Sequence, residues 1–197
     1  MSIAATQLME ADEFLLWCLD QEQRYELVDG VPVEMMAGAS RIHDRIVVNI
    51  IASLHQQLGS GPCHPTTADT GLRTRIRSVR RPDAMVTCDP PKPNLYEALE
   101  PHLAVEVISK SNTGIAWERK LKEYRRHEKL EYILLVDSEV AAVTLFERTK
   151  TGWDVLDLER FFDVVELPTI SCRLSLADIY ANTGIEELPQ ADNANHA

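Results

Sequence analysis

The sequence predicts an α/β protein in which helices flank one mixed β-sheet. Amphipathic helical patterns stand on both sides of a run of strand-like segments, and residues 103–109 are apolar enough for a central strand buried on both faces. The chain has 197 residues, of which 45% are hydrophobic and 26% are charged, and this composition suits a globular domain with a sizeable core. We expect one domain over residues 1–188 and a disordered tail over residues 189–197.

The first third of the chain predicts a helix, a hairpin and a second, longer helix. Residues 7–19 place apolar side chains at roughly helical spacing. Asp29 and Gly30 separate two short extended pieces, which indicates a β-hairpin. Ser40 can cap a helix with a wide apolar stripe that continues to about Leu58, where a Gly-Ser-Gly-Pro segment ends it.

The rest of the chain alternates strands with one further long helix. The predicted elements are strands over 83–88, 103–109, 131–137, 140–147 and 153–158, a proline-rich loop over 90–101, a helix over about 114–128 that Ser111–Thr113 can cap, and a short helix near 176–180. We expect the strand over 140–147 to lie at the edge of the sheet. Its apolar side chains would offer a seam for a homodimer, the commonest type of oligomer.

Cysteine spacing and hydropathy exclude several classes of protein. Cys18, Cys63, Cys88 and Cys172 are widely spaced and form no CxxC pair, so neither a zinc knuckle nor a redox pair is indicated. We expect four buried free thiols in a reducing compartment. No apolar run approaches the ~20 residues of a membrane span, and the N-terminus lacks a secretory signal. A cytoplasmic protein without membrane contact is expected.

The distribution of charge favours a polyanionic partner although the net charge is −11. Residues 1–37 and residues 153–197 each carry a net charge of −7, which leaves +3 for the middle of the chain. Five arginines lie within nine residues of this middle segment: Arg73, Arg75, Arg77, Arg80 and Arg81. The period of a strand would place the first three on one face, where they could hold phosphates. The alternative is a solvated face that the acidic ends of the chain neutralise.

Glu106 is the least expected residue of the apolar segment 103–109, because burial of a carboxylate is costly unless it is paired or coordinated. Asp83 follows Pro82 at the start of another predicted strand. Two carboxylates on neighbouring strands would form an oxygen-ligand site for a hard cation such as Mg²⁺. The alternatives are a buried salt bridge between Glu106 and an arginine, and a turn role for Asp83.

The order of these motifs resembles the PD-(D/E)xK nuclease superfamily and, more closely, the bacterial restriction endonuclease family of the Uma-two type. The resemblance covers most of the chain. The segments that carry it are 24–30 (RYELVDG), 40–43, 81–87 (RPDAMVT), 105–111 (VEVISKS), Lys120 with Tyr124, and 131–137 (EYILLVD).

This resemblance implies a restriction-endonuclease-like fold and a metal-dependent endonuclease, with DNA as the substrate and RNA not excluded. Asp83 and Glu106 would hold Mg²⁺ or Mn²⁺, and Glu26 would be a further acid near the metal. The lysine that the superfamily places two residues after the glutamate is Ile108 here. Lys120 on the following helix can replace it, because helical geometry directs Lys120 toward the sheet and Lys122 toward solvent.

The remaining expectations concern the substrate and an alternative function. Arg73, Arg75, Arg77 and Arg81 would bind the nucleic-acid backbone, which carries little sequence information. His43 could reach the site as an accessory residue, or it could be a structural histidine. Many members of the family carry an aspartate four residues before the lysine, where this chain has Ala116. This departure keeps open a second function, a catalytically weak nuclease-fold protein that binds nucleic acid or a partner.

Overall fold

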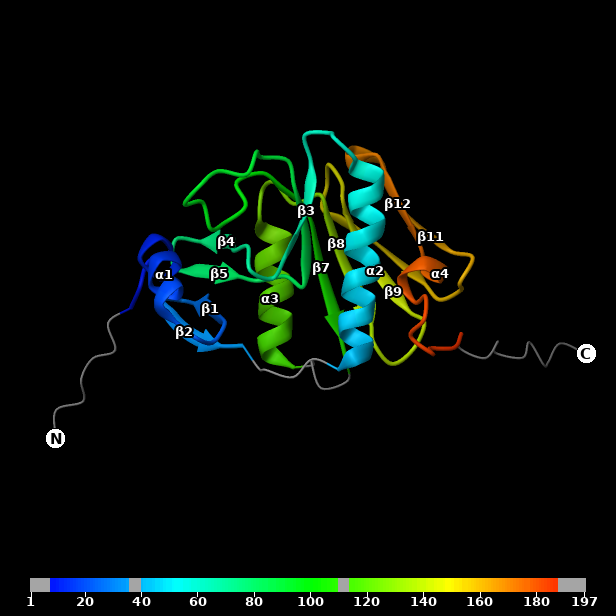
Figure 1. The fold of residues 1–197 in the computed structure, drawn as a ribbon, viewed down its shortest axis with the longest axis horizontal. Coiled ribbons are helices and arrows are strands. Elements are labelled where there is room, and N and C mark those ends of the chain that lie inside the picture. The colour runs from blue at the N-terminus through cyan, green and yellow to red at the C-terminus, as the bar shows by residue number, and fades with distance from the viewer. Residues whose placement is uncertain (1–7, 36–39, 110–113, 188–197) are drawn as a thin grey trace, which may run out of the picture.

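The structure is a computed structural model that describes residues 8–35, 40–109 and 114–187, and a six-stranded sheet forms its centre (Figure 1). In spatial order the strands are β10 (Trp153–Leu158), β9 (Val143–Arg148), β8 (Tyr132–Asp137), β7 (Pro101–Ile108), β6 (Ala84–Thr87) and β3 (His64–Thr67). β7 and β8 are parallel, and the other neighbouring pairs are antiparallel. The predicted α/β class with a mixed sheet is confirmed.

Two long helices cover opposite faces of this sheet, α2 (Arg41–Leu58) and α3 (Ile115–Arg126), which flank β7 in Figure 1. Ser40 caps α2 as predicted, since its hydroxyl accepts a hydrogen bond from the His43 backbone N–H at 3.1 Å. The apolar stripe of α2 packs on the face that carries Val105 and Val107, whereas α3 packs on the face that carries Ala104. Because successive strand residues point to opposite faces, Glu106 points toward α3.

The terminal regions add two smaller sheets. The N-terminal region contains α1 (Ala11–Trp17), a 3-10 turn (Cys18–Asp20), and a four-stranded sheet of β2 (Val31–Glu34), β1 (Tyr25–Val28), β5 (Ser78–Arg80) and β4 (Leu72–Arg75). The C-terminal region contains the hairpin of β11 (Val164–Leu167) and β12 (Cys172–Ser175), joined by a 3-10 turn (Pro168–Ile170), and α4 (Leu176–Ile179). The predicted hairpin at Asp29 and Gly30 is confirmed. Gly30 has a φ of +88°, a conformation that glycine adopts without strain.

Two predicted strands differ from the structure. The arginine-rich segment is not one strand with a single arginine face, because β4 ends at Arg75 and the chain turns at Ile76 and Arg77 into β5. The strand predicted over 140–147 begins at Val143, and it is not at the edge of the sheet because β10 pairs with it along its whole length. The homodimer seam proposed for this strand is therefore wrong.

Three further expectations concern segments or properties outside this core. The helix caps expected at Ser111–Thr113 and the tail expected over 189–197 lie outside the described residues. None of the helices in the described part of the chain combines the length and the hydropathy of a membrane span.

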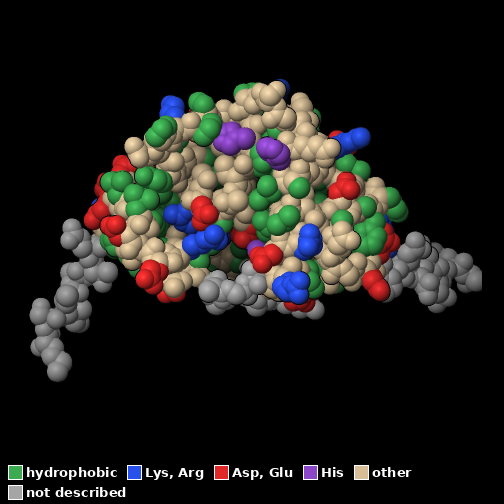
Figure 2. All heavy atoms as spheres, viewed as in Figure 1, with side chains coloured by type: hydrophobic (Ala, Val, Ile, Leu, Met, Phe, Trp, Pro, Cys, Tyr) green, Lys and Arg blue, Asp and Glu red, His purple; other side chains and the backbone are tan. Residues whose placement is uncertain are grey.

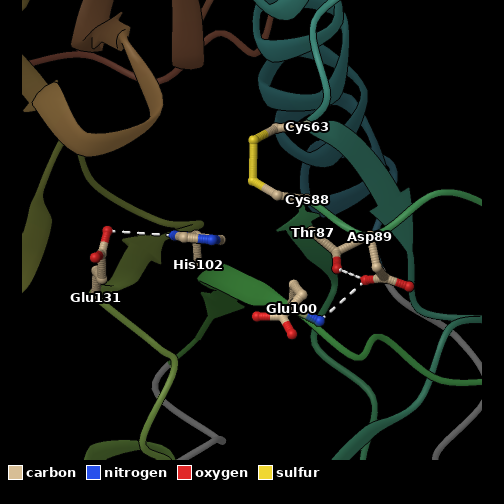
Figure 3. Close-up of a disulfide and its surroundings, with 7 residues drawn as sticks. All are labelled: Cys63, Thr87, Cys88, Asp89, Glu100, His102 and Glu131. Atoms are coloured by element: carbon tan, nitrogen blue, oxygen red, sulfur yellow. Dashed lines mark hydrogen bonds and ion pairs between the residues drawn. A yellow bond between two sulfur atoms is a disulfide. The ribbon is translucent and has the colours of Figure 1, made fainter.

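A disulfide joins Cys63 to Cys88, so the expectation of four free thiols is wrong for these two residues (Figure 3). Its origin is the antiparallel register of β3 and β6, in which His64 lies opposite Thr87 and the next pair outward consists of the two cysteines. Cys18 and Cys172 are free thiols. Sequence spacing could not show this pairing, because it depends on a strand that has no apolar pattern.

The carboxylate of Asp89 fixes the chain beside this disulfide (Figure 3). It accepts hydrogen bonds from the Thr87 hydroxyl and from the backbone N–H groups of Leu99, at 3.1 Å, and Glu100, at 3.0 Å. Both ends of the proline-rich loop before β7 are thereby held to the end of β6.

We predict that reduction of the Cys63–Cys88 disulfide lowers the free energy of unfolding. The two cysteines are 25 residues apart, and a crosslink over such a loop restricts the unfolded chain by about 3 kcal/mol. Chemical denaturation with and without dithiothreitol measures the change. The Cys63→Ser/Cys88→Ser variant should match the reduced protein and should not respond to dithiothreitol. Equal stability of the oxidised and reduced protein would contradict the prediction.

Candidate active site at the carboxyl end of β7

Asp83 and Glu106 occupy facing positions on two neighbouring strands. β6 and β7 pair with Ala84 opposite Val105, so the next residues of this register are Asp83 and Glu106. Asp83 Oδ2 accepts a hydrogen bond of 2.8 Å from the Val107 backbone N–H, which fixes its carboxylate against β7. Glu106 is 7% exposed and lies near the carboxyl end of the strand, as the sequence predicts.

Lys120 reaches this pair of acids from α3. Its Nζ lies 2.7 Å from Glu106 Oε1 and 3.0 Å from Glu26 Oε1. The Tyr124 hydroxyl, one helical turn further along, donates a hydrogen bond of 2.5 Å to the same Glu106 oxygen. The choice of Lys120 over Lys122 agrees with this geometry, since Lys122 is exposed. Glu26, Lys120 and Glu106 therefore form one continuous ion-pair chain, in which Glu106 is buried and the other two are half-buried.

Sequence reasoning missed the next two members of this chain, Arg80 and Glu123, which are 4% and 2% exposed. Arg80 donates two hydrogen bonds to the Glu123 carboxylate, at 2.7 and 3.0 Å, and a third to Glu26 Oε2 at 3.0 Å. The Thr74 hydroxyl donates to Glu123 at 2.9 Å. The position of Glu123, three residues after Lys120 and hence on a neighbouring part of the same helix surface, was the signal available in the sequence.

His43 enters the site from α2, on the other side of the sheet. Its Nε2 lies 3.3 Å from Asp83 Oδ2, and this hydrogen bond raises the pKa of the imidazole. Figure 2 shows acidic, basic and histidine side chains gathered around a hollow between α2 and α3. The structure thus brings together Asp83, Glu106, Lys120, Glu26 and His43.

The four arginines expected at the nucleic-acid backbone do not share one surface. Glu97 and Asp12 engage the Arg73 guanidinium, with Glu97 oxygens at 2.7 and 2.8 Å, and Glu10 lies 3.7 Å from Arg77. Acidic residues of the N-terminal region therefore neutralise part of the arginine run, which was the alternative interpretation.

The other two arginines of this set have different surroundings. Arg81 is buried and donates to the backbone carbonyl oxygens of Tyr25, Ala68 and Asp69. Arg75 is exposed and makes no ion pair with any described residue.

Burial and charge determine the protonation of the central groups. Burial raises the pKa of Glu106 to about 7, with the charge of Lys120 opposing this rise and the charges of Asp83 and Glu26 adding to it. Burial alone would lower the pKa of Lys120, but the two neighbouring carboxylates outweigh it and the net shift is upward. Lys120 therefore stays protonated at neutral pH.

The donor set fits a hard divalent cation bound through two protein carboxylates. Within the described residues, the hydrogen bonds and ion pairs engage Asp83 Oδ2 and Glu106 Oε1, which leaves the second oxygen of each group for a cation. No set of three His, Cys, Asp or Glu side chains in the described part of the chain is arranged to hold a metal. This is compatible with Mg²⁺, which commonly takes one or two carboxylates and completes its shell with water and substrate phosphate.

Comparisons with known proteins agree with this architecture. Residues 11–178 match the Uma2 family, described as "Putative restriction endonuclease". Two similar proteins come from Synechocystis sp. "Uncharacterized protein slr1290" is 27% identical over 87% of this chain and 91% of its own length. "Uncharacterized protein sll1609" is 30% identical over 70% of this chain and 79% of its own length.

A crystal structure from Anabaena variabilis, described as "a putative nuclease belonging to DUF820", shares the fold with a TM-score of 0.68. The likeness covers 87% of this chain and 97% of that one at 15% sequence identity. At this identity the likeness shows the fold alone. It supports the restriction-endonuclease-like fold that the sequence resemblance implied.

We predict that Arg80→Leu destabilises the protein by about 3–5 kcal/mol, because it removes the buried cation that the buried Glu123 and the half-buried Glu26 share. Urea denaturation of the purified variant measures the change. Arg75→Leu is the matched control, and its effect should stay within about 0.5 kcal/mol because Arg75 is exposed and unpaired among the described residues. Similar small effects of the two substitutions would contradict the prediction.

The raised pKa of Glu106 also predicts a pH dependence of stability in the metal-free protein. Between the ordinary pKa of 4.5 and the folded value of about 7, the folded protein keeps a proton that the unfolded chain has lost. The free energy of unfolding should therefore fall as pH rises through this window, by up to about 3 kcal/mol more than in Glu106→Gln. Denaturation in EDTA at pH 5 and pH 8 tests this. Glu118→Gln, which changes an exposed glutamate of α3, should behave like the wild type, and an unaltered slope in Glu106→Gln would refute the assignment.

Proposed function

The chain belongs to the Uma2 family, and from this premise we propose that it is a metal-dependent endonuclease that hydrolyses phosphodiester bonds in DNA. The observation that carries the proposal is the pair of facing carboxylates, Asp83 and Glu106, with the Lys120 ammonium 2.7 Å from Glu106. Two oxygen ligands and one protonated amine at the end of a buried strand are the groups that phosphodiester hydrolysis requires.

Asp83 and Glu106 would hold Mg²⁺ or Mn²⁺. When bound, such a cation supplies a water molecule of lowered pKa and neutralises negative charge on the phosphate. The backbone N–H of Val107 orients Asp83 for this role, and the Tyr124 hydroxyl orients Glu106. Both orienting groups act on one oxygen of their carboxylate, so the other oxygen remains available.

Lys120 would act on the reacting groups as a fixed ammonium that donates hydrogen bonds and keeps its proton. Because Glu106 and Glu26 keep it protonated, its ammonium can orient the attacking water or stabilise the charge that develops on the phosphate. Glu26 has the role of positioning Lys120. Arg80 in turn holds Glu26 through its second oxygen. His43 would be an accessory residue that restrains Asp83.

We predict that the protein nicks or linearises plasmid DNA in Mg²⁺ or Mn²⁺ and that EDTA prevents this. Glu106→Gln and Lys120→Met should each abolish cleavage because they remove a metal ligand and the fixed ammonium. Their matched controls are Glu118→Gln and Lys122→Met. These change exposed residues of α3, the helix that carries Lys120, and the variants should cleave like the wild type. Agarose gels of a time course measure the products, and circular dichroism verifies that each variant is folded.

Position 116 supports a second candidate, a catalytically weak nuclease-fold protein that binds nucleic acid. Many members of the family carry an aspartate at this position, where this chain has Ala116. Ala116 is exposed on α3 one turn before Lys120, so the aspartate would lie on the same part of the helix surface as the lysine. This chain therefore lacks an acidic group that other members have beside the lysine. Calorimetric titration with Mn²⁺ separates the two candidates. Metal binding that Glu106→Gln removes supports the nuclease, whereas DNA binding without metal binding or cleavage supports the binding protein.

A further inference from the structure

A β-bulge at the end of β4 directs Arg75 toward α3. The register of β4 on β5 pairs Arg75 with Ser78 and passes over Thr74. Arg75 therefore faces the same side of the N-terminal sheet as Arg80, which lies two residues after Ser78. From this side Arg80 binds Glu123 of α3. The Arg75 side chain, which is exposed and makes no ion pair with a described residue, thus stands on the side of the sheet that α3 covers.

Arg119 approaches the same place from α3. Its guanidinium binds Asp29, in the turn between β1 and β2, and lies 3.3 Å from Glu123 Oε1 of its own helix. The next residue of the helix, Lys120, lies 3.0 Å from Glu26 of β1. Two consecutive cations of α3 therefore contact one hairpin, and the second of them belongs to the candidate active site. Figure 2 shows basic side chains beside acidic ones on the side of the hollow where β4 and β5 lie in Figure 1.

Asp29 is the anion that Arg75 and Arg119 share. Its backbone N–H donates a hydrogen bond of 3.2 Å to the hydroxyl of Ser78, the residue opposite Arg75. A hydrogen bond from Arg119 lowers the pKa of the Asp29 carboxyl, and the charge of Arg75 lowers it further. The Asp29 side chain is 58% exposed, and ion pairs between exposed groups are weak. Another anion can therefore take the place of this carboxylate.

We propose that Arg75 and Arg119 bind a backbone phosphate of duplex DNA next to the phosphate that is cut, and that this phosphate displaces Asp29 from Arg119. The proposal rests on the proposed nuclease function. In the absence of DNA, Asp29 would occupy the phosphate position and hold the Arg119 guanidinium ready beside Lys120. The contact would therefore regulate how tightly the site takes its substrate.

The geometry of α3 suits two successive phosphates of one strand. The side chains of Arg119 and Lys120 leave the helix about 100° apart, so they serve different phosphates. The α-carbons of the two residues are ~3.8 Å apart, so a strand with one phosphate at Lys120 brings the adjacent phosphate to Arg119. A planar guanidinium can bind two phosphate oxygens at once. Such contacts fix the position of the backbone and carry no sequence information.

The first test compares Arg75→Gln/Arg119→Gln with the control Lys122→Gln/Arg125→Gln, which loses the same charge. The control residues are exposed, make no ion pair with a described residue, and border a cavity with Trp153 on the other flank of α3. Fluorescence anisotropy of a labelled DNA duplex of about 20 base pairs, in EDTA so that no cleavage occurs, gives the affinity at several salt concentrations. We expect the first variant to bind roughly tenfold more weakly for every duplex sequence, with a slope of log K against log salt smaller by ~0.9, the value for one lost phosphate contact. The control should keep the slope of the wild type.

The second test is Asp29→Asn, which should have the opposite effect. Asparagine tolerates the positive φ of this position, 48°, and keeps the backbone hydrogen bond to Ser78, but it releases Arg119. Binding of the same duplex should tighten roughly two- to fivefold. Glu118→Gln removes one negative charge from the other flank of α3 and should change the affinity less. Circular dichroism verifies the fold of each variant, and Arg75→Gln alone, which breaks no ion pair with a described residue, should show part of the loss.

Several results would overturn the proposal. If Arg75→Gln/Arg119→Gln binds like the wild type or loses no more than the control pair, these arginines are not the phosphate contacts, while a wild type that cleaves DNA leaves the nuclease function standing. If Asp29→Asn binds no more tightly than Glu118→Gln, the phosphate does not displace Asp29. If the wild type binds single-stranded RNA and no duplex, the partner is wrong. If it neither binds nor cleaves any nucleic acid, the proposed function fails together with this inference.

Discussion

The buried carboxylate of Glu106 is the constraint on which the rest of the site depends. A charge in the middle strand of a sheet is costly, and here Lys120 and Tyr124 of α3 compensate it. Both compensating groups come from one helix and lie one turn apart, so α3 can satisfy Glu106 only in one rotation and at one height against the sheet. The Tyr124 side chain also packs against apolar residues of the same sheet face, which further restricts the position of α3. A single acidic residue in β7 thus fixes how α3 docks, and it does so at the carboxyl end of the strand.

The same helix links the central sheet to the N-terminal one. Glu123 faces Arg80 of β5, and Arg80 also binds Glu26 of β1, so residues from three elements share one buried guanidinium. Replacing such a network by apolar residues is often neutral for stability, whereas removing one member leaves uncompensated charges. The network therefore says little about the overall stability of the protein. Its clearer effect is to fix where its residues lie relative to one another. It places Glu26, a residue of a separate small sheet, within 3.0 Å of Lys120.

The sequence predicted those helices, strands and turns whose signal lies in neighbouring residues. The period of apolar residues found α2 and β7, and the capping serine and the Asp-Gly turn marked element ends. The turn at Ile76 and Arg77 was missed because neither residue is a typical turn former. β3 was missed because His64–Thr67 alternates no apolar side chains, and the disulfide was missed with it. Asp83, Glu106 and Lys120 could be named from spacing and resemblance. The helical spacing of Glu123 from Lys120 indicated that Glu123 lies near the site. Its partner Arg80 is 43 residues away and meets it only when α3 has docked, so the spacing could not identify the pair.

The two carboxylates that hold Lys120 are not equivalent, and this difference bears on how the site could work. Glu106 faces Asp83 and would share a cation with it, so its interaction with Lys120 must tolerate a second positive charge nearby. Glu26 lies on the other side of the ammonium, and its two oxygens are divided between Lys120 and Arg80. Its hold on Lys120 does not require Glu106. The ammonium can therefore keep its place and its proton when the charge around Glu106 changes, which is the property that a fixed donor beside a reacting phosphate needs.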